Sequence, residues 1–172
     1  MASQVTLKGI TRELMHLYYQ DFQRDPDIFM DMGCFSEFCY DPKAIDLRFD
    51  RYIQAEDRRS FFIMDGAFPV GEICLKEIDP VKKQAVMSIH LQNDSVKNRG
   101  IGTAAEKLIL AYAFDQMNLE VVLADAVLKN TRSQHVLEKV GFDFVMTEGI
   151  FKFYRFTLEK YRRMKADQDP AR

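Results

Sequence analysis

The change of hydrophobic period between residues 84 and 128 constrains the fold more than any other feature. "QAVMSIHLQ" (84–92) alternates, with Met87, Ile89 and Leu91 on one side and Ser88, His90 and Gln92 on the other. After a polar loop, apolar residues recur at helical spacing, at Ile101, Ala104, Ala105, Leu108, Ile109 and Tyr112. "EVVLADAVL" (120–128) is then apolar enough for a central strand. A strand–helix–strand crossover of this kind predicts that the two strands are parallel neighbours.

The rest of the chain predicts a mixed, mostly antiparallel sheet in an α/β (α+β) domain. Further strands are expected at 5–11, 60–66, 68–79, 141–149 and 151–161, the last two as a pair. Further helices are expected at 11–20, 41–57 and 130–142. In the last of these, Asn130 is placed as N-cap and Gly141 as the C-terminal glycine. We therefore expect six to seven strands flanked by about four helices, in one domain over 1–165 with a disordered tail at 166–172.

Composition excludes several functional classes. The net charge of −2 gives no overall basicity for nucleic-acid binding. No run of about 18 apolar residues indicates a membrane span, and the N-terminus lacks a signal peptide's apolar stretch, so we expect a cytoplasmic protein. Cys34, Cys39 and Cys74 form no CxxC pair and suit reduced thiols. The three histidines and these cysteines lack zinc-site spacing, so no metal is expected.

The stretch "SVKNRGIGTAAEKLI" (95–109) has the character of a phosphate site. Helix N-termini present unpaired N–H groups and a partial positive charge, and glycines let a phosphate approach them closely. Lys97 and Arg99 add full charges beside Gly100 and Gly102. The alternative is that the two glycines only shape a turn before a helix.

Two other phosphate-binding designs do not fit. "GIGTAA" matches the letters of a dinucleotide fingerprint, G-x-G-x-x-A, but that fingerprint needs an apolar strand leading into the first glycine. Here the preceding "DSVKNR" is polar and charged. The G-x-x-x-x-G-K-[ST] pattern of a P-loop is absent from the sequence.

Two motifs together resemble the Gcn5-related N-acetyltransferase (GNAT) superfamily, closest to its ribosomal-protein-alanine and spermidine acetyltransferase branch. The family's loop pattern [QR]-x-x-G-x-[GA] is filled by Lys97 to Gly102, with Lys in place of Gln or Arg at the first position. The second motif, N-x-x-S-x-x-x-x-x-K-x-G-F, is matched by Asn130, Ser133, Lys139, Gly141 and Phe142. The resemblance covers roughly residues 60–160.

The resemblance implies a site for acetyl-CoA as co-substrate. Loop residues would hold its pyrophosphate, namely Lys97, Asn98, Arg99, Gly100, Ile101, Gly102 and Thr103. The strand before the loop would splay from its parallel neighbour, with the pantetheine arm in the gap beside the backbone of Leu91 and Gln92. Asn130 would hydrogen-bond that arm, unless it is a plain helix cap, and Ser133 would contact it or simply make room.

The implied reaction is transfer of the acetyl group to a primary amine by direct attack in a ternary complex. His90 and Glu72 are the candidates for the base, although His90 also suits an ordinary edge histidine and Glu72 a solvent-facing carboxylate. In many relatives a tyrosine acts as the general acid at the position where this chain has Leu137. Tyr154 is the candidate to replace that tyrosine as the general acid. The alternative is that Tyr154 belongs to the core and that the thiolate is released to solvent.

The sequence says less about the acceptor of the acetyl group. Residues 21–50 contain eight acidic and three basic side chains, about −5, which favours a cationic amine by long-range attraction. A small amine, a polyamine and a protein N-terminus all remain open, and the acids equally suit helix capping and solubility. No membrane or nucleic-acid partner is expected, and a homodimer is left open. The alternative function is a catalytically weak CoA-binding sensor or interaction module of the same fold.

Overall fold

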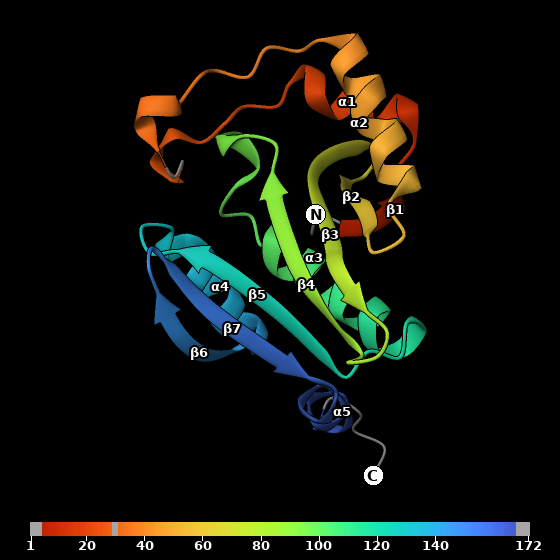
Figure 1. Ribbon diagram of the computed structural model, residues 1–172, viewed down its shortest axis with the longest axis vertical. Helices are drawn as coiled ribbons and strands as arrows, with labels where there is room; N and C mark the ends of the chain where they lie inside the picture. Colours follow the sequence, from red (N-terminus) through yellow and green to blue (C-terminus); the bar gives the residue numbers. More distant parts are fainter. Residues whose placement is uncertain (1–4, 29–30, 168–172) are drawn as a thin grey trace.

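The computed structural model describes residues 5–28 and 31–167, which form a seven-stranded mixed sheet with helices on both faces (Figure 1). The strands are β1 (Val5–Gly9), β2 (Arg59–Asp65), β3 (Phe68–Asp79), β4 (Gln84–Leu91), β5 (Val121–Val127), β6 (Asp143–Glu148) and β7 (Phe151–Thr157). The α-helices are α1 (Arg12–Gln20), α2 (Pro42–Gln54), α3 (Ile101–Ala111), α4 (Thr131–Val140) and α5 (Leu158–Asp167). The sheet order β1-β2-β3-β4-β5-β7-β6 confirms the expected fold class.

The predicted parallel pair is present and opens at one end. Neighbouring strands pair antiparallel except β4 and β5, which run parallel from Gln84↔Val121 to Met87↔Ala124. Beyond that register β4 continues to Leu91 and β5 to Val127 without pairing with each other, and the two strands diverge in Figure 1. Their divergence leaves a gap in the sheet directly before the loop that leads into α3.

The two faces of the sheet carry different helices because the strand residues alternate. On β2, Phe62 and Met64 pack with α1 and α2, whereas Ile63 belongs to the larger core that includes α3 and α4. On β4, Met87 lies in the larger core, with Ile89 and Leu91 packed against it, as the alternation predicts. His90 faces the other way and contacts Tyr18 of α1, with ring centroids 6.1 Å apart.

Side-chain caps fix the starts of three of the four helices α1 to α4. Thr11 accepts from the Leu14 N–H at α1, Asp41 from Lys43 at α2, and Asn130 from Ser133 at α4. Helix α4 ends at Gly141, whose φ of 114° is accessible mainly to glycine. Both predicted roles in α4 are thereby confirmed.

The expected end of the last strand was wrong. Residues 158–161 begin helix α5, since the Thr157 hydroxyl accepts from the Lys160 N–H and apolar side chains at helical spacing pack on the core. The helix includes two residues of the expected tail, and 168–172 lie outside the described residues. The buried face of α3 includes Ile101, Ala105 and Ile109 as predicted, but its edge differs: Leu108 is 39% exposed, while Glu106 and Leu110 are buried.

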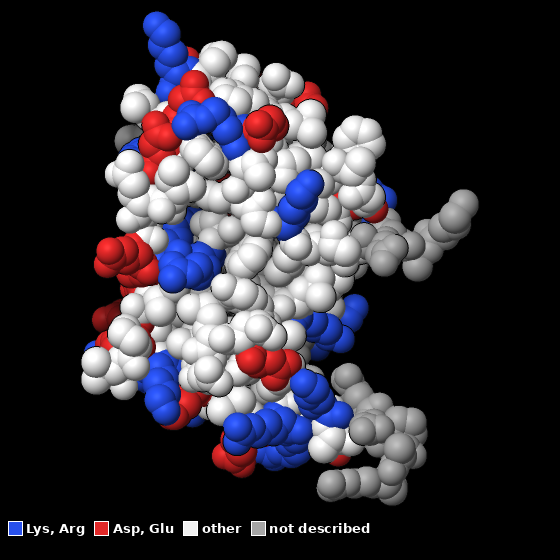
Figure 2. Space-filling model, turned by 90° about the vertical axis from the view of Figure 1, so that its right-hand side faces the viewer, with Lys and Arg blue, Asp and Glu red and all other residues white. Residues whose placement is uncertain are grey.

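The face drawn in Figure 2 has no large patch of a single charge, because basic and acidic side chains are intermixed on it. Some of the charged side chains of the protein are paired: Arg12 binds both Asp46 and Asp50, at 2.5 and 2.7 Å. None of the helices among the described residues combines the length and apolarity needed to cross a bilayer.

Candidate acetyl-CoA site

The gap between β4 and β5 opens into two adjoining cavities. The smaller, about 250 Å³, lies between the diverging strands and is lined by Met87, Ala124, Asn130, Ser133 and Leu137 among others. The larger, about 690 Å³, extends from there past the start of α3 to the segment after α1. Ile89, Asn130 and Ser133 line both cavities. The two cavities therefore form one elongated site that passes the end of β4.

The start of α3 forms one wall of the larger cavity. Gly100 holds φ at 77° and Asn98 at 59°, left-handed conformations of the kind found in anion-binding nests. Unlike α1, α2 and α4, helix α3 has no side chain capping its first N–H groups. Gly102 lines the cavity, and a Cβ added to it would meet no atom within 4 Å. The uncapped amides and the missing side chain suit a phosphate group.

The basic side chains of the loop have protein partners. Lys97 lines the larger cavity and its ammonium binds Asp25 and Asp94, the first of which is only 14% exposed. Arg99 binds Asp65 at 2.9 Å. The loop therefore presents mainly backbone N–H groups to a ligand, while its lysine ties it to the segment after α1. Asn98, Arg99, Gly100, Ile101 and Thr103 do not line the cavities, and Ile101 is a core residue at 1% exposure.

Asn130 and Ser133 lie where the two cavities meet. The Asn130 Oδ1 accepts from the Ser133 N–H at 3.1 Å, which is the cap of α4. With this oxygen engaged, the Asn130 amide nitrogen keeps its donors for a ligand, so the capping role and a binding role are compatible.

Leu91 and Gln92, which were expected to offer backbone groups to the pantetheine arm, differ in their position relative to the cavity. Leu91 lines the larger cavity. Gln92 is absent from both cavity walls, and its N–H donates to the Val70 carbonyl at 2.9 Å while its carbonyl accepts from Gln23. Its side chain also donates to the Tyr18 carbonyl at 2.8 Å. Gln92 thus connects the end of β4 to α1 and β3 by hydrogen bonds and does not face the cavity.

His90 and Glu72 lie side by side, but only His90 faces the cavity. The Glu72 carboxylate is 1% exposed, accepts from the Tyr19 hydroxyl at 2.9 Å, and lies 3.5 Å from Arg58. The idea of a solvent-facing carboxylate at Glu72 was therefore wrong. His90 is 40% exposed at its side chain, and burial by its surroundings lowers its pKa while the Glu72 carboxylate opposes that shift.

Tyr154 does not reach the site. It is 1% exposed, its hydroxyl donates to Glu138 at 3.3 Å, and it lines neither cavity. Burial raises the pKa of Tyr154 to about 12, with the Glu138 carboxylate adding to the shift. The proposal of Tyr154 as the acid is therefore wrong in position: β7 turns this side chain into the core. Leu137, by contrast, lines the smaller cavity.

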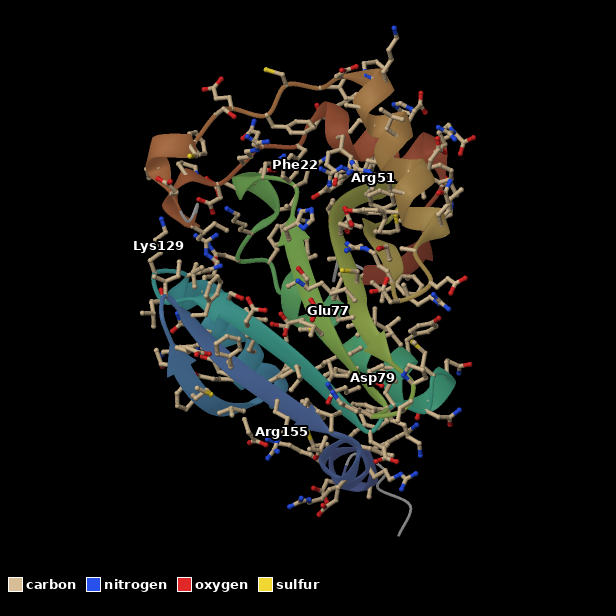
Figure 3. All side chains as sticks on the ribbon, in the orientation of Figure 1. Phe22, Arg51, Glu77, Asp79, Lys129 and Arg155 are labelled. Carbon is tan, nitrogen blue, oxygen red and sulfur yellow. The ribbon has the colours of Figure 1, made fainter. Side chains whose placement is uncertain are left out.

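Several cavity residues were missed by sequence reasoning. Phe22, beside the end of β4 in Figure 3, makes an edge-to-face contact with His90, with ring centroids 5.7 Å apart. Arg132 on the first turn of α4 and Val136 one turn later line the larger cavity. Glu106 lines it too, and its spacing of four residues from Gly102 was a usable signal, because i and i+4 share one helix face.

The acidic segment is largely engaged in structural contacts. Asp46 and Asp50 bind Arg12, Asp25 binds Lys97, Asp31 caps the short 3-10 helix at 32–34, and Asp41 caps α2. Asp25 and Asp31 line the larger cavity together with Arg24, Lys97 and Arg132. The cavity is thus mixed in charge rather than a negative wall. Among the described residues, no three of the His, Cys, Asp and Glu side chains group together as a metal site.

Solved structures share this architecture. A spermidine N-acetyltransferase from Vibrio cholerae in complex with CoA and spermine matches 92% of this chain and 98% of its own, with a TM-score of 0.73 and 17% identity. Its F149G mutant reaches a TM-score of 0.76 at 18% identity, over 94% of this chain and 98% of its own.

Curated relatives are similar over part of the sequence. A spermidine N(1)-acetyltransferase from Escherichia coli (strain K12) is 27% identical over 94 residues, which are 55% of this chain and 50% of that protein. A putative ribosomal N-acetyltransferase, YdaF, from Bacillus subtilis (strain 168) is 31% identical over 80 residues, 46% of this chain and 43% of its own. The matches thus span about half the length of these relatives or less. The family model of the acetyltransferase (GNAT) domain matches residues 4–143, and with this extent the chain belongs to the GNAT acetyltransferase family.

Proposed function

We propose that the protein is an acetyl-CoA-dependent N-acetyltransferase that acetylates a primary amine by direct attack in a ternary complex. The observation that carries this is the continuous cavity that joins the uncapped start of α3 to His90 through the gap between β4 and β5. In a member of the GNAT family, such a cavity has the place of the acetyl-CoA site.

The chain offers separate groups for each part of the co-substrate. The uncapped start of α3, where Gly102 lines the cavity without a side chain, suits the pyrophosphate. The Asn130 amide nitrogen and the end of β4 at Leu91 suit the pantetheine arm. When bound, acetyl-CoA supplies the acetyl group as an activated thioester.

His90 is the proposed general base, with Glu72 behind it as a positioning residue. An amine attacks only when uncharged, so a base or a water chain must remove its proton. The lowered pKa of His90 keeps its imidazole neutral near pH 7 and able to accept that proton. Glu72, held by Tyr19 and Arg58, would stabilise the protonated form of the imidazole by its charge.

No acid for the leaving thiolate is assigned. Leu137 has the position of the usual tyrosine, and Tyr154 is committed to Glu138 in the core. Protonation of the thiolate by solvent is the consistent route, because the cavity is open. The same observation favours the second candidate, a CoA-binding module with weak turnover.

The acceptor is proposed to be a small primary amine, with polyamines as the first class to test. The support is the spermidine acetyltransferases among the similar proteins, one of which is described as a complex with spermine. The charge of the cavity adds little, because its acids are matched by bases.

A thermal-shift series with acetyl-CoA, CoA, NAD and ATP tests the cofactor. A ligand at 100 times its dissociation constant stabilises the native state by about 2.7 kcal/mol, so only the two CoA species should raise the melting temperature. Release of free thiol from acetyl-CoA is then followed with polyamines, small monoamines and N-terminal peptides. Tight CoA binding without thiol release for any amine would favour the binding module.

A further inference from the structure

A buried carboxyl group without a protein partner lies in the wall of the proposed cofactor cavity. Glu106 is 1% exposed, and its Oε2 is fully buried without a hydrogen-bond partner. It lines the larger cavity one helical turn beyond Gly102. Leaving a buried polar group unpaired costs about 1–3 kcal/mol and more for a charged group, so this arrangement calls for an explanation.

The environment favours the protonated form of this carboxyl group. Apolar side chains that line the same cavity include Leu91 and Val136. Burial raises the pKa of Glu106 to about 8, with no other cause contributing. Near pH 7 the group is therefore mainly a neutral carboxylic acid, which has one O–H donor.

The other charged groups of the cavity are committed elsewhere or lie on other elements. The titratable and charged side chains that line it with Glu106 are Arg24, Asp25, Asp31, His90, Lys97 and Arg132. Lys97 binds Asp25 and Asp94, and on α4, which packs along α3, Glu138 accepts from Tyr154. Among the described residues, none of these cations forms an ion pair with Glu106.

We propose that Glu106 is a cofactor-positioning residue whose protonated carboxyl group donates a hydrogen bond to an oxygen of bound CoA. This rests on the proposed function. Its place just beyond the start of α3 puts the donor beside the phosphate-binding end of the cavity. An ionised carboxylate there would repel the pyrophosphate and offer no donor. Binding of CoA therefore favours the protonated group, and the complex takes up a proton wherever free Glu106 is ionised.

Calorimetry with acetyl-CoA, in the absence of an acceptor amine, tests this coupling. Acetyl-CoA is the probe because it has no free thiol to titrate. Titrations in two buffers of different ionisation enthalpy give the protons taken up at about pH 7 and about pH 9. We expect uptake close to zero at the lower pH and approaching one proton at the higher. The affinity should fall by up to about tenfold per pH unit above pH 8.

Glu106→Gln replaces the acid by a neutral amide that still donates a hydrogen bond. It should bind acetyl-CoA like the wild type near pH 7, more tightly than the wild type near pH 9, and without the additional proton. Glu159→Gln removes the same charge from a side chain that is 87% exposed on α5, and it should behave as wild type.

Three results would overturn the proposal. They are equal proton uptake in the wild type and Glu106→Gln, the same affinity ratio at both pH values, and weak binding of Glu106→Gln at every pH. If this variant does not fold, the carboxyl carbon of Glu106 can be followed in wild-type protein by ¹³C NMR. Its resonance should stay at the protonated position near pH 9 only when acetyl-CoA is bound. Failure of all proteins to bind acetyl-CoA would instead refute the proposed function.

Discussion

Glu72 and His90 occupy directly paired positions on β3 and β4, and their Oε2 and Nε2 atoms are 3.7 Å apart. The distance is too long for a hydrogen bond, so their relation is mainly electrostatic. The carboxylate is buried beneath α1 and the imidazole opens to the cavity, so the two side chains differ in their access to a ligand. This difference supports the proposed division of roles, in which His90 accepts a proton and Glu72 raises the pKa of His90.

Replacing His90 by Ala should lower kcat and leave the dissociation constant of CoA nearly unchanged. Loss of a general base costs about 10²–10⁴ in rate. The rate of the wild type should also fall in acid, as His90 becomes protonated. Because the pKa of His90 is lowered from its ordinary value of 6.5, this fall should occur below about pH 6.5. Initial rates of thiol release across pH, compared between the two proteins, separate this limb from that of the amine. An unchanged rate and pH profile would eliminate His90 as the base.

Glu72→Gln should shift the acidic limb to lower pH instead of abolishing activity. The Glu72 carboxylate raises the pKa of His90 against the effect of burial, so its removal lowers that pKa further. The same pH–rate measurement checks this, with folding verified by circular dichroism because Arg58 loses a partner. If Glu72→Gln is as inactive as His90→Ala at every pH, Glu72 is itself needed for proton transfer.

Gly102→Trp should destroy the affinity for CoA, because its side chain would fill the space that a phosphate needs at the start of α3. Gly102→Ala is the matched variant. It adds only a methyl group, fits the [GA] position of the loop pattern, and should weaken binding far less. Calorimetry with CoA gives both dissociation constants. Equal affinities in the two variants would contradict the placement of the ligand at this helix start.

The sequence predicts the sheet and the position of the glycine loop at the start of α3 because both depend on local patterns. The strands and helix of the β4–α3–β5 crossover, the cap at Asn130 and the loop glycines are each encoded by short local patterns of about fifteen residues or fewer. The role of Tyr154 depends instead on which face of β7 it occupies, and alternation alone does not say which face meets the ligand. Glu72 was misjudged for the same reason: its burial comes from Tyr19, 53 residues away. Long-range packing of this kind leaves no periodic signal.

The acidic segment illustrates a second limit. A count of charges over 21–50 suggests an attractive wall, yet Arg12 and Lys97, from outside the segment, neutralise much of it. Net charge is a property of a segment, whereas the field in a cavity depends on which pairs form in three dimensions. The sequence therefore left the acceptor open, and only the similar proteins favour polyamines.

The unpaired carboxyl group of Glu106 should make the ligand-free protein less stable as pH rises. Its folded pKa of about 8 lies above the ordinary value of 4.5, so its contribution to stability is fully present below pH 4.5 and is lost as pH rises to about 8. Each unit of difference corresponds to about 1.4 kcal/mol, so the total loss is several kcal/mol. Glu106→Gln lacks this loss and should gain stability relative to the wild type across that pH range. Urea unfolding of both proteins without ligand, from about pH 5 to about pH 9, measures the difference. A stability difference that does not change with pH would mean that Glu106 titrates normally in the folded protein.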